Sequence, residues 1–214
     1  MSKQKIIFLH GFGTLGGMKN RKAAFLNEKL AKVDSADFYA IDFNPTPKDF
    51  QYHTISGMID RLRQFILLND CETVCLIGIS QGANVALNYA ARYGGVEKLL
   101  LLAPELFYDP YISDEELAEW EELVSAPVFH YGFQKEIPLH IAHHRDGMRY
   151  LDAPEPPCPI TLIHGRKDSA IPIERSEAYA GRFDDKVTLV EVDDDHSLRD
   201  HLSLISENAV LLIS

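Results

Sequence analysis

Residues 78–82, "GISQG", are the stretch of this sequence best suited to nucleophilic chemistry. The stretch closes the apolar run "TVCLIGI" and precedes a segment with helical spacing, so we expect Ser80 at a sharp turn from a strand into a helix. Such a turn pushes the serine hydroxyl clear of the sheet, and side chains at Gly78 and Gly82 would collide with it. The helix N-terminus behind the turn favours developing negative charge. We interpret Ser80 as a nucleophile; the alternative is a simple turn with a capping serine.

A nucleophilic serine needs a histidine as base and a carboxylate that holds the histidine's tautomer. Where the serine sits on a strand–turn–helix, the chain order is serine, acid, histidine. Asp168 follows the strand-like run "ITLIH" and His196 follows "VTLVEV", so both are expected at the same sheet edge as Ser80. Glu105, directly after "LLLLAP", is the alternative acid. Residues 193–195, all Asp, are too close to His196 in sequence and are expected to bond the loop backbone or cap the last helix.

The elements that must position these residues alternate along the chain. Aliphatic and β-branched runs predict strands at 5–9, 37–42, 73–79, 97–103, 160–164 and 186–192, and helical spacing predicts helices at 19–33, 54–69, 82–93, 173–182 and 199–213. Most of the strands are apolar throughout, as in a parallel sheet covered on both faces. We therefore expect an α/β fold with an open, doubly wound, mostly parallel sheet of about six strands.

The alternation breaks once, over about 104–158, and this segment is too long for an ordinary connection. A capping-box pattern from Ser113 to Glu116 predicts a helix over 113–124, with Leu117, Trp120 and Val124 on one face. We interpret the segment as a helical lid, inserted into a single domain that spans 1–214, over the sheet edge where ligands bind in such folds. A purely structural cap is the alternative. The segment is rich in aromatic residues: Phe107, Tyr108, Tyr111, Phe129, Tyr131, Phe133 and Tyr150.

The chain resembles the α/β-hydrolase superfamily, in a compact form similar to small bacterial cytosolic serine esterases. The motifs that carry the resemblance are "HGFG" (10–13), "GISQG" (78–82), "HGRKDSAIP" (164–172) and "DDDHSL" (193–198). The resemblance implies that Ser80 is the nucleophile, His196 the general base and then acid, and Asp168 the orienting carboxylate. The sequence departs from the family's pattern in one respect: we expect it to begin at the family's third strand, without the usual N-terminal hairpin.

The glycines of "GFGTLG" (11–16) allow two interpretations. They match the G-x-G-x-x-G pattern of dinucleotide-binding proteins, with Asp42 near the place of a ribose-binding acid. Against this, His10 stands between the strand and the first glycine, and "GGMKN" extends the loop where a helix should already run. The resemblance instead implies an oxyanion hole, formed by the backbone N–H groups of Phe12 and Gln81. We favour the oxyanion hole, which requires no cofactor.

Other histidines and the cysteines are given structural interpretations. The cluster "HIAHHRD" (140–146) has helix-compatible spacing for a metal site, but we favour an ordinary solvated or lid-surface face and expect no metal. His10 and His164 both precede glycine at strand ends and are expected to pack loops. The three cysteines are too few for a zinc site of two pairs and are expected to be buried thiols: Cys71, Cys75 and Cys158.

Composition limits the partners. With 21 Lys and Arg against 32 Asp and Glu, the formal net charge is −11, which argues against nucleic acid. No apolar run has the length of a signal peptide or a membrane span, so we expect a cytoplasmic protein without membrane insertion. The expected function is hydrolysis of a small-molecule carboxylic ester. A thioesterase, an amidase, a carbon–carbon bond hydrolase and a catalytically silent fold used for protein interaction stay open, as does the oligomeric state.

Overall fold

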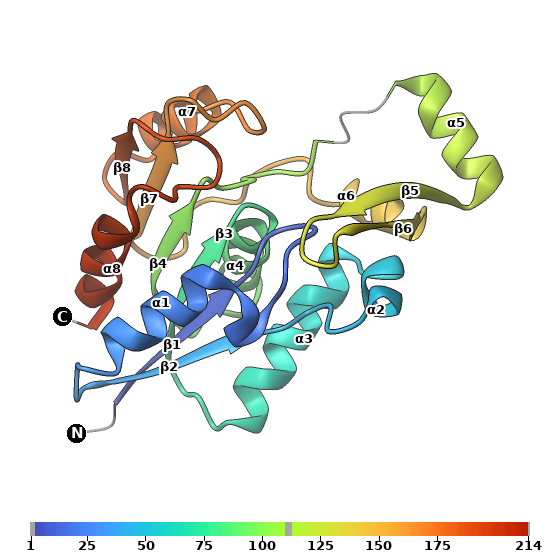
Figure 1. Cartoon of the computed structure of the whole chain (residues 1–214). Helices are drawn as coiled ribbons and strands as arrows, with labels where there is room; N and C mark the ends of the chain where they lie inside the picture. The colour runs from blue at the N-terminus through green and yellow to red at the C-terminus, as the bar shows by residue number, and fades with distance from the viewer. Residues whose placement is uncertain (1–2, 110–112, 214) are drawn as a thin grey trace.

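The protein is built on a six-stranded sheet in which all strands run parallel. The computed structural model describes residues 3–109 and 113–213; Tyr111, one of the aromatic residues noted above, lies outside them. The strands lie in the order β2 (Ala36–Ile41), β1 (Gln4–Leu9), β3 (Val74–Ile79), β4 (Val96–Leu102), β7 (Ile160–Gly165) and β8 (Val187–Val192). The predicted six-stranded α/β sheet is confirmed (Figure 1).

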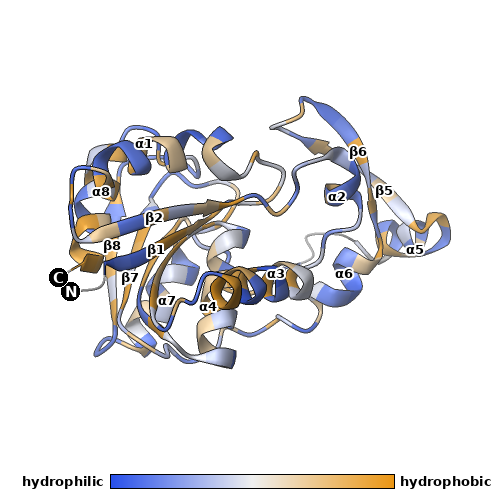
Figure 2. Ribbon diagram, turned by 90° about the horizontal axis from the view of Figure 1, so that it is seen from below, coloured by the Kyte–Doolittle hydropathy of each residue, from blue (hydrophilic) through white to orange (hydrophobic). Residues whose placement is uncertain are grey.

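Helices cover both faces of this sheet (Figure 2). Because successive strand side chains point to opposite faces, Ile6 and Phe8 pack in one layer and Ile7 and Leu9 in the other, which explains why the strands are apolar throughout. The first layer contains α1 (Arg21–Leu30) and α8 (Leu202–Val210); the second contains α3 (Ile55–Leu68), α4 (Gln81–Tyr93) and α7 (Glu174–Arg182). Shorter helical turns lie at η1 (Gly17–Lys19), α2 (Pro47–Gln51) and η2 (Leu211–Ile213).

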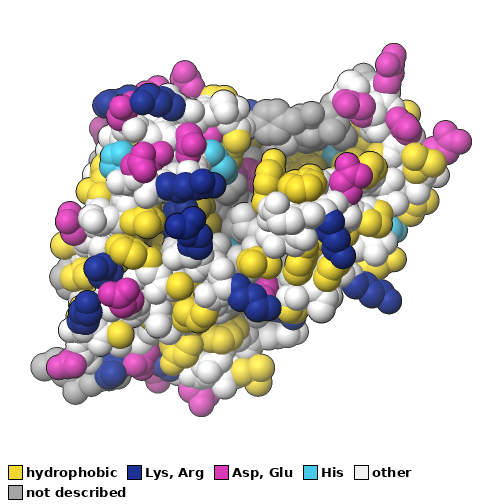
Figure 3. All heavy atoms as spheres, in the orientation of Figure 1, with side chains coloured by type: hydrophobic (Ala, Val, Ile, Leu, Met, Phe, Trp, Pro, Cys, Tyr) yellow, Lys and Arg dark blue, Asp and Glu magenta, His cyan; other side chains and the backbone are white. Residues whose placement is uncertain are grey.

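The segment between β4 and β7 forms a separate lobe at one end of the sheet (Figure 1). It contains α5 (Asp114–Leu123), an antiparallel hairpin of β5 (Ser125–His130) and β6 (Lys135–His140), and α6 (Ala142–Gly147). We call these residues, 113–147, the cap. The predicted helix and its Ser113–Glu116 capping box are confirmed, and Figure 3 shows acidic side chains along the outer side of α5. The hairpin was not predicted.

One prediction for the cap helix is wrong. The helix ends at Leu123, and Val124 adopts a left-handed conformation with φ 64°. Val124 is therefore not on the buried helix face but 48% exposed, whereas Trp120 is buried and Leu117 partly buried.

The cap has a small hydrophobic core that it shares with the rest of the molecule. Trp120, Ile137, Leu139 and Ile141 pack against Phe50 of α2. The Trp120 indole N–H also donates to the Leu139 carbonyl at 3.0 Å. Phe12 packs against the same group, so the cap rests on the loop after β1.

Candidate active site

Ser80 lies at the junction of β3 and α4 in a strained backbone conformation. Its φ is 52° and its ψ −121°, a combination that costs free energy for any residue with a side chain. The surrounding structure enforces it: the Ser80 N–H donates to the Leu102 carbonyl at 3.0 Å, while its carbonyl accepts the N–H of Ala83 at 2.9 Å. The serine is half-buried, and its side chain reaches a cavity described below.

The glycines around Ser80 are required by close backbone packing. A Cβ at Gly78 would lie 2.6 Å from the Ala83 Cα, and one at Gly82 would overlap the carbonyl oxygens of Leu9 and His10. In both cases the atoms would be much closer than an ordinary van der Waals contact allows. The expected role of Gly78 and Gly82 in making room for the turn is therefore confirmed.

Asp168 and His196 meet at the carboxyl ends of β7 and β8. His196 Nδ1 lies 2.7 Å from Asp168 Oδ2. A carboxylate only accepts here, so Nδ1 carries the proton and Nε2 keeps a free lone pair. The His196 side chain is 33% exposed and that of Asp168 fully buried. This is the tautomer that a general base with a free Nε2 needs.

Asp168 is held by more partners than the sequence indicated. Its Oδ1 accepts the N–H groups of Ala170 at 2.9 Å and Ile171 at 2.8 Å, and its Oδ2 also accepts from His164 Nε2 at 3.1 Å. Burial alone would raise the pKa of Asp168, but the hydrogen bonds from His164, His196 and Ile171 outweigh it and hold this pKa well below its ordinary value.

His164 is buried and packs the loop after β7, as predicted, but it also contacts Asp168, which the sequence did not indicate. Its Nε2 faces two acceptors, Asp168 Oδ2 and the Ile171 carbonyl, so this nitrogen carries the proton. Its Nδ1 then accepts the Ser176 hydroxyl at 2.7 Å. The sequence signal that could have found this contact is the spacing of four residues between His164 and Asp168 across the turn after β7.

The loop after β1 brings the backbone N–H of Phe12 near Ser80. The preceding carbonyl, that of Gly11, accepts the Thr14 hydroxyl at 2.8 Å and lies 2.9 Å from His10 Nδ1. Because the C=O and N–H of a peptide point in opposite directions, these bonds orient the Phe12 N–H. A Cβ at Gly11 would lie 3.2 Å from the Ser80 Cβ, which shows how closely this peptide approaches the serine.

His10 has a structural part in this arrangement. Its Nε2 accepts the Phe43 N–H at 3.1 Å, so the proton lies on Nδ1 and is donated to Gly11. Burial lowers the pKa of His10 and favours this neutral form. Among the described residues, neither the Phe12 N–H nor the Gln81 N–H donates a hydrogen bond to another protein atom. Both donors are free for a ligand.

The same loop contradicts the dinucleotide-binding interpretation. Helix α1 begins at Arg21, five residues after the last glycine of the G-x-G-x-x-G match, so the glycines lead only into the single 3-10 turn η1 and not into the N-terminus of an α-helix. Gly16 instead packs against Asp42 and His10, where a Cβ would lie 2.6 Å from the Asp42 Cα. The Asp42 carboxylate accepts the N–H of Asn44 at 3.2 Å.

Ser80 and His196 open onto one cavity of about 310 Å³. The cap and the chain that leads to it supply the apolar wall, with Tyr108, Trp120, Val128 and Leu139. The cavity is also lined by Phe12, Gln81, Glu105, Asp109, His143, Ala170 and Ile171.

Glu105, the alternative acid considered from the sequence, also lines this cavity. It shares the cavity with Ser80, but no hydrogen bond joins its side chain to His196. Burial raises the pKa of Glu105 to about 8, against the opposing attraction of Arg175. A carboxyl group that is neutral near pH 7 is a poor partner for a histidine that must become positively charged.

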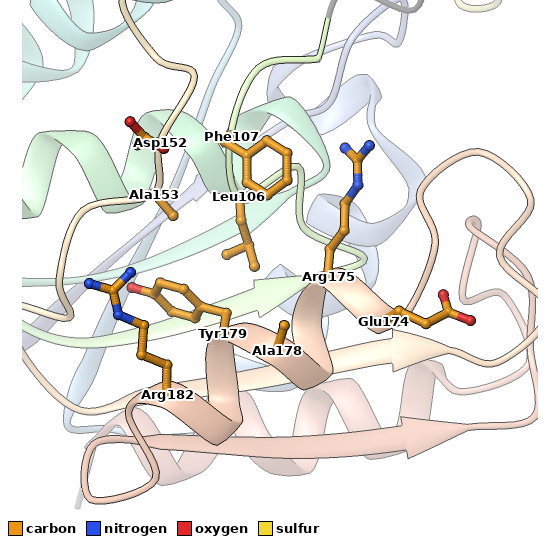
Figure 4. Close-up of a pocket in the computed structure, with 9 residues that line it drawn as sticks. All are labelled: Leu106, Phe107, Asp152, Ala153, Glu174, Arg175, Ala178, Tyr179 and Arg182. Atoms are coloured by element: carbon orange, nitrogen blue, oxygen red, sulfur yellow. The ribbon is translucent and has the colours of Figure 1, made fainter.

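A larger cavity, of about 730 Å³, lies over α7 and is separate from this chemistry (Figure 4). It is lined by Leu106, Phe107, Asp152, Ala153, Glu174, Arg175, Ala178, Tyr179 and Arg182. None of Ser80, Asp168 and His196 reaches it. Its charged side chains are of both signs, so it has no clear preference for one class of ligand.

We expected the histidines of "HIAHHRD" on a solvated or lid-surface face, but two of them are buried. His143 and His144 are each only 5% exposed. His143 packs against the rings of Phe12 and His53, with ring centroids 5.5 and 4.5 Å away. Among the described residues, no three His, Cys, Asp or Glu side chains are grouped so as to hold a metal ion.

The remaining predictions concern the last loop and the cysteines. Asp194 accepts the N–H groups of Asp195 and Asp200, and Asp195 accepts that of Ser197, as expected for loop-bonding carboxylates. Asp193 instead pairs with Lys167 at 2.8 Å. The three cysteines are buried and unpaired, as predicted.

A family model described as "Alpha/beta hydrolase family" matches residues 6–203. The chain belongs to the alpha/beta hydrolase family. Solved structures of this hydrolase fold superpose on nearly the whole chain. A putative hydrolase from Agrobacterium vitis S4 aligns with a TM-score of 0.80 and 20% identity, covering 99% of this chain and 88% of that one.

Two further structures are of proteins named with a bound compound or an activity. Est1E from Butyrivibrio proteoclasticus, with ferulic acid bound, has a TM-score of 0.76 at 18% identity and covers 99% of this chain and 90% of its own. The monoacylglycerol lipase of Paleococcus ferrophilus has a TM-score of 0.74 at 16% identity, covering 99% and 97%. At these identities the likeness shows the fold alone. No curated protein matches the sequence. Among the described residues, no helix of this hydrolase is both long and apolar enough to cross a bilayer.

Proposed function

We propose that this alpha/beta hydrolase is a serine hydrolase that cleaves carboxylic esters of small molecules, with Ser80, His196 and Asp168 as its catalytic triad. One observation carries the proposal. The strained Ser80 opens onto the same cavity as His196, whose Nδ1 proton is held by Asp168 at 2.7 Å. The monoacylglycerol lipase among the structural neighbours agrees with the ester substrate.

In the proposed reaction, Ser80 Oγ attacks the acyl carbon while His196 Nε2 takes its proton. Asp168, ionised and fully buried, stabilises the imidazolium that results. The oxyanion accepts hydrogen bonds from the N–H groups of Phe12 and Gln81, and each such donor is worth roughly 3–4 kcal/mol of barrier. His196 then protonates the leaving alcohol, and a water molecule repeats the sequence on the acyl-enzyme.

No hydrogen bond joins Ser80 Oγ to His196 in this structure. Catalytic hydrogen bonds are often long without substrate and tighten in the complex. Because both residues line one cavity, we expect the Ser80 side chain to rotate toward His196 when substrate binds.

The cap is proposed to act as a lid that supplies the acyl-binding wall. Trp120, Val128 and Leu139 face Ser80 across the cavity and favour an apolar acyl or aromatic group.

Hydrolysis of p-nitrophenyl esters of rising acyl length, measured on wild type, Ser80→Ala and Ser203→Ala, tests the proposal. Ser203 is an exposed serine on α8 and serves as the control. We expect turnover by wild type and Ser203→Ala and none by Ser80→Ala. Substantial turnover by Ser80→Ala would contradict the assignment. Matched oxygen and sulfur esters of the same acyl group decide between an esterase and a thioesterase.

A further inference from the structure

A groove of about 340 Å³ next to the proposed active site is lined by basic residues. Four of its lining residues are cationic and none is acidic: Lys19, Arg21, Lys22 and Arg199. The chain as a whole has a formal net charge of −11, so this cluster opposes the average charge of the molecule. Figure 3 shows Lys and Arg side chains gathered near the middle of this face, over the start of α1 and the loop before α8.

These cations are not paired directly with carboxylates. Within residues 3–109 and 113–213, none of the four forms an ion pair. Asp194 and Asp195 attract Lys22, and Asp195 attracts Arg199, but the hydrogen bonds of both carboxylates are made within their own loop. Asp194 accepts His201 Nδ1 at 3.0 Å, and Asp195 accepts the N–H of Ser197 at 2.7 Å.

The side chains, rather than the start of α1, make this groove basic. Asn20 Oδ1 already caps the helix by accepting the N–H groups of Lys22 and Ala23. Burial, followed by the positive charge of Arg199, lowers the pKa of Lys22 to about 8. Like charges held this close are relieved by a bound anion.

The groove adjoins the two loops that carry His196 and Phe12. Lys22 Nζ donates to the carbonyl of Ser197, the residue after His196. Thr14, which orients the Phe12 peptide, also lines the groove. A leaving group that is protonated by His196 and extends past Ser197 would reach these cations, and Leu15 and Leu202 supply apolar surface in the same groove.

We propose that this groove binds a phosphate carried by the leaving alcohol or thiol of the substrate. The hydrolase would then act on acyl esters of phosphorylated compounds. This substrate class rests on the proposed function, whereas binding of phosphate by the groove does not.

Titration with inorganic pyrophosphate at low ionic strength, followed by calorimetry, tests the groove itself. Arg21→Gln/Arg199→Gln removes two of its cations, and Lys48→Gln/Lys135→Gln removes the same charge from two exposed lysines elsewhere. Lys22 is left in place because it holds the His196 loop. We expect wild type and the control to bind alike and Arg21→Gln/Arg199→Gln to bind about tenfold more weakly or worse. If thermal melts show that this double variant is unfolded, the two single variants take its place.

Absence of binding to wild type, or equal binding by the two folded double variants, would overturn the inference. Sensitivity of the binding to added salt is expected, since exposed charges are screened.

Monobutyryl esters of linear diols, from propanediol to hexanediol, test the substrate class. The second hydroxyl is either free or phosphorylated. We expect wild type to prefer a phosphorylated ester by about tenfold in kcat/KM, mainly through KM, and Arg21→Gln/Arg199→Gln to lose this preference. Equal kcat/KM of wild type for the free and the phosphorylated ester of every diol would overturn the proposed substrate class.

The two proposals fail separately. A wild type that binds pyrophosphate at the groove but hydrolyses no ester would refute the proposed function and leave the phosphate site standing. A wild type that hydrolyses esters but neither binds pyrophosphate nor prefers phosphorylated esters would refute the phosphate site and leave the proposed function standing.

Discussion

His164 Nε2 lies 3.1 Å from Asp168 Oδ2, and His196 Nδ1 lies 2.7 Å from the same oxygen. One carboxylate oxygen thus accepts from two imidazole rings. The His164 ring is fully buried and fixed by the Ser176 hydroxyl, while the His196 ring faces the cavity. The buried His164 ring therefore fixes the orientation in which the Asp168 carboxylate meets His196.

His164→Phe is expected to lower kcat by about tenfold with little change in KM, because Asp168 loses one charged hydrogen bond that fixes its position. His164→Gln, whose amide can still donate to Asp168, should retain more activity than His164→Phe. Unchanged kcat in a folded His164→Phe protein would show that His164 only packs the turn.

Glu105 provides a prediction at alkaline pH. Its pKa is raised to about 8 by burial, so the side chain beside Ser80 is neutral below that pH and negative above it. A negative charge near the oxyanion opposes its formation, and kcat/KM should therefore fall as the pH rises through about 8. Glu105→Gln should remain active and lose this decline. Asp168→Asn should instead be severely impaired; the opposite ranking would make Glu105 the catalytic acid.

Thr14 provides a test of the oxyanion loop. Thr14→Val removes the hydroxyl that holds the Gly11 carbonyl at 2.8 Å while keeping the shape of the side chain. With a less well-fixed peptide, the Phe12 N–H is misdirected, and we expect kcat to drop by about tenfold with KM nearly constant. Thr14→Ser, which keeps the hydroxyl, is the control. Equal kinetics of the two variants would argue against this loop as an oxyanion donor.

Buried histidines make the fold sensitive to acid. Burial lowers the pKa of His53 to about 4 and that of His143 to about 3, from 6.5. At pH values below 6.5 but above these lowered pKa values, the two histidines bind protons in the unfolded chain and not in the folded chain. The free energy of unfolding should thus fall as the pH drops below about 6.5, by at most about 1.4 kcal/mol per pH unit for each histidine.

Urea unfolding at about pH 7 and about pH 5 measures this slope. In His53→Asn/His143→Asn the amide nitrogens replace the two Nδ1–H donors, which bond the carbonyls of Phe50 and His53. The variant should show a shallower slope. Burial also lowers the pKa of His10, His130 and His144, so part of the slope should remain. A wild type equally stable at both pH values would contradict the expectation.

The sheet could be predicted from the sequence because its strands are buried on both faces and leave uninterrupted apolar runs. The contact between His196 and Asp168 could be anticipated for a related reason. Both residues follow the carboxyl ends of neighbouring parallel strands, and β7 and β8 pair over their whole lengths.

The hairpin of the cap could not be predicted in the same way. Pro127 and Pro138 lie opposite each other in its register, and proline weakens any strand signal. The Tyr131–Gln134 turn with its glycine was the remaining sign of a hairpin. The burial of His143 and His144 depends on the packing of α6 against α3 and against the loop before α3. Packing between distant elements leaves no pattern in the local sequence. The contact between His164 and Asp168 was missed because a histidine before glycine reads equally well as loop packing.

An activated Ser80 is the central claim, and intact-mass spectrometry after treatment with a fluorophosphonate tests it most directly. Wild type and Ser80→Ala would be treated side by side, each shown to be folded by circular dichroism. We predict one adduct on wild type and none on Ser80→Ala. No adduct on folded wild type, or an equal adduct on Ser80→Ala, would contradict the account.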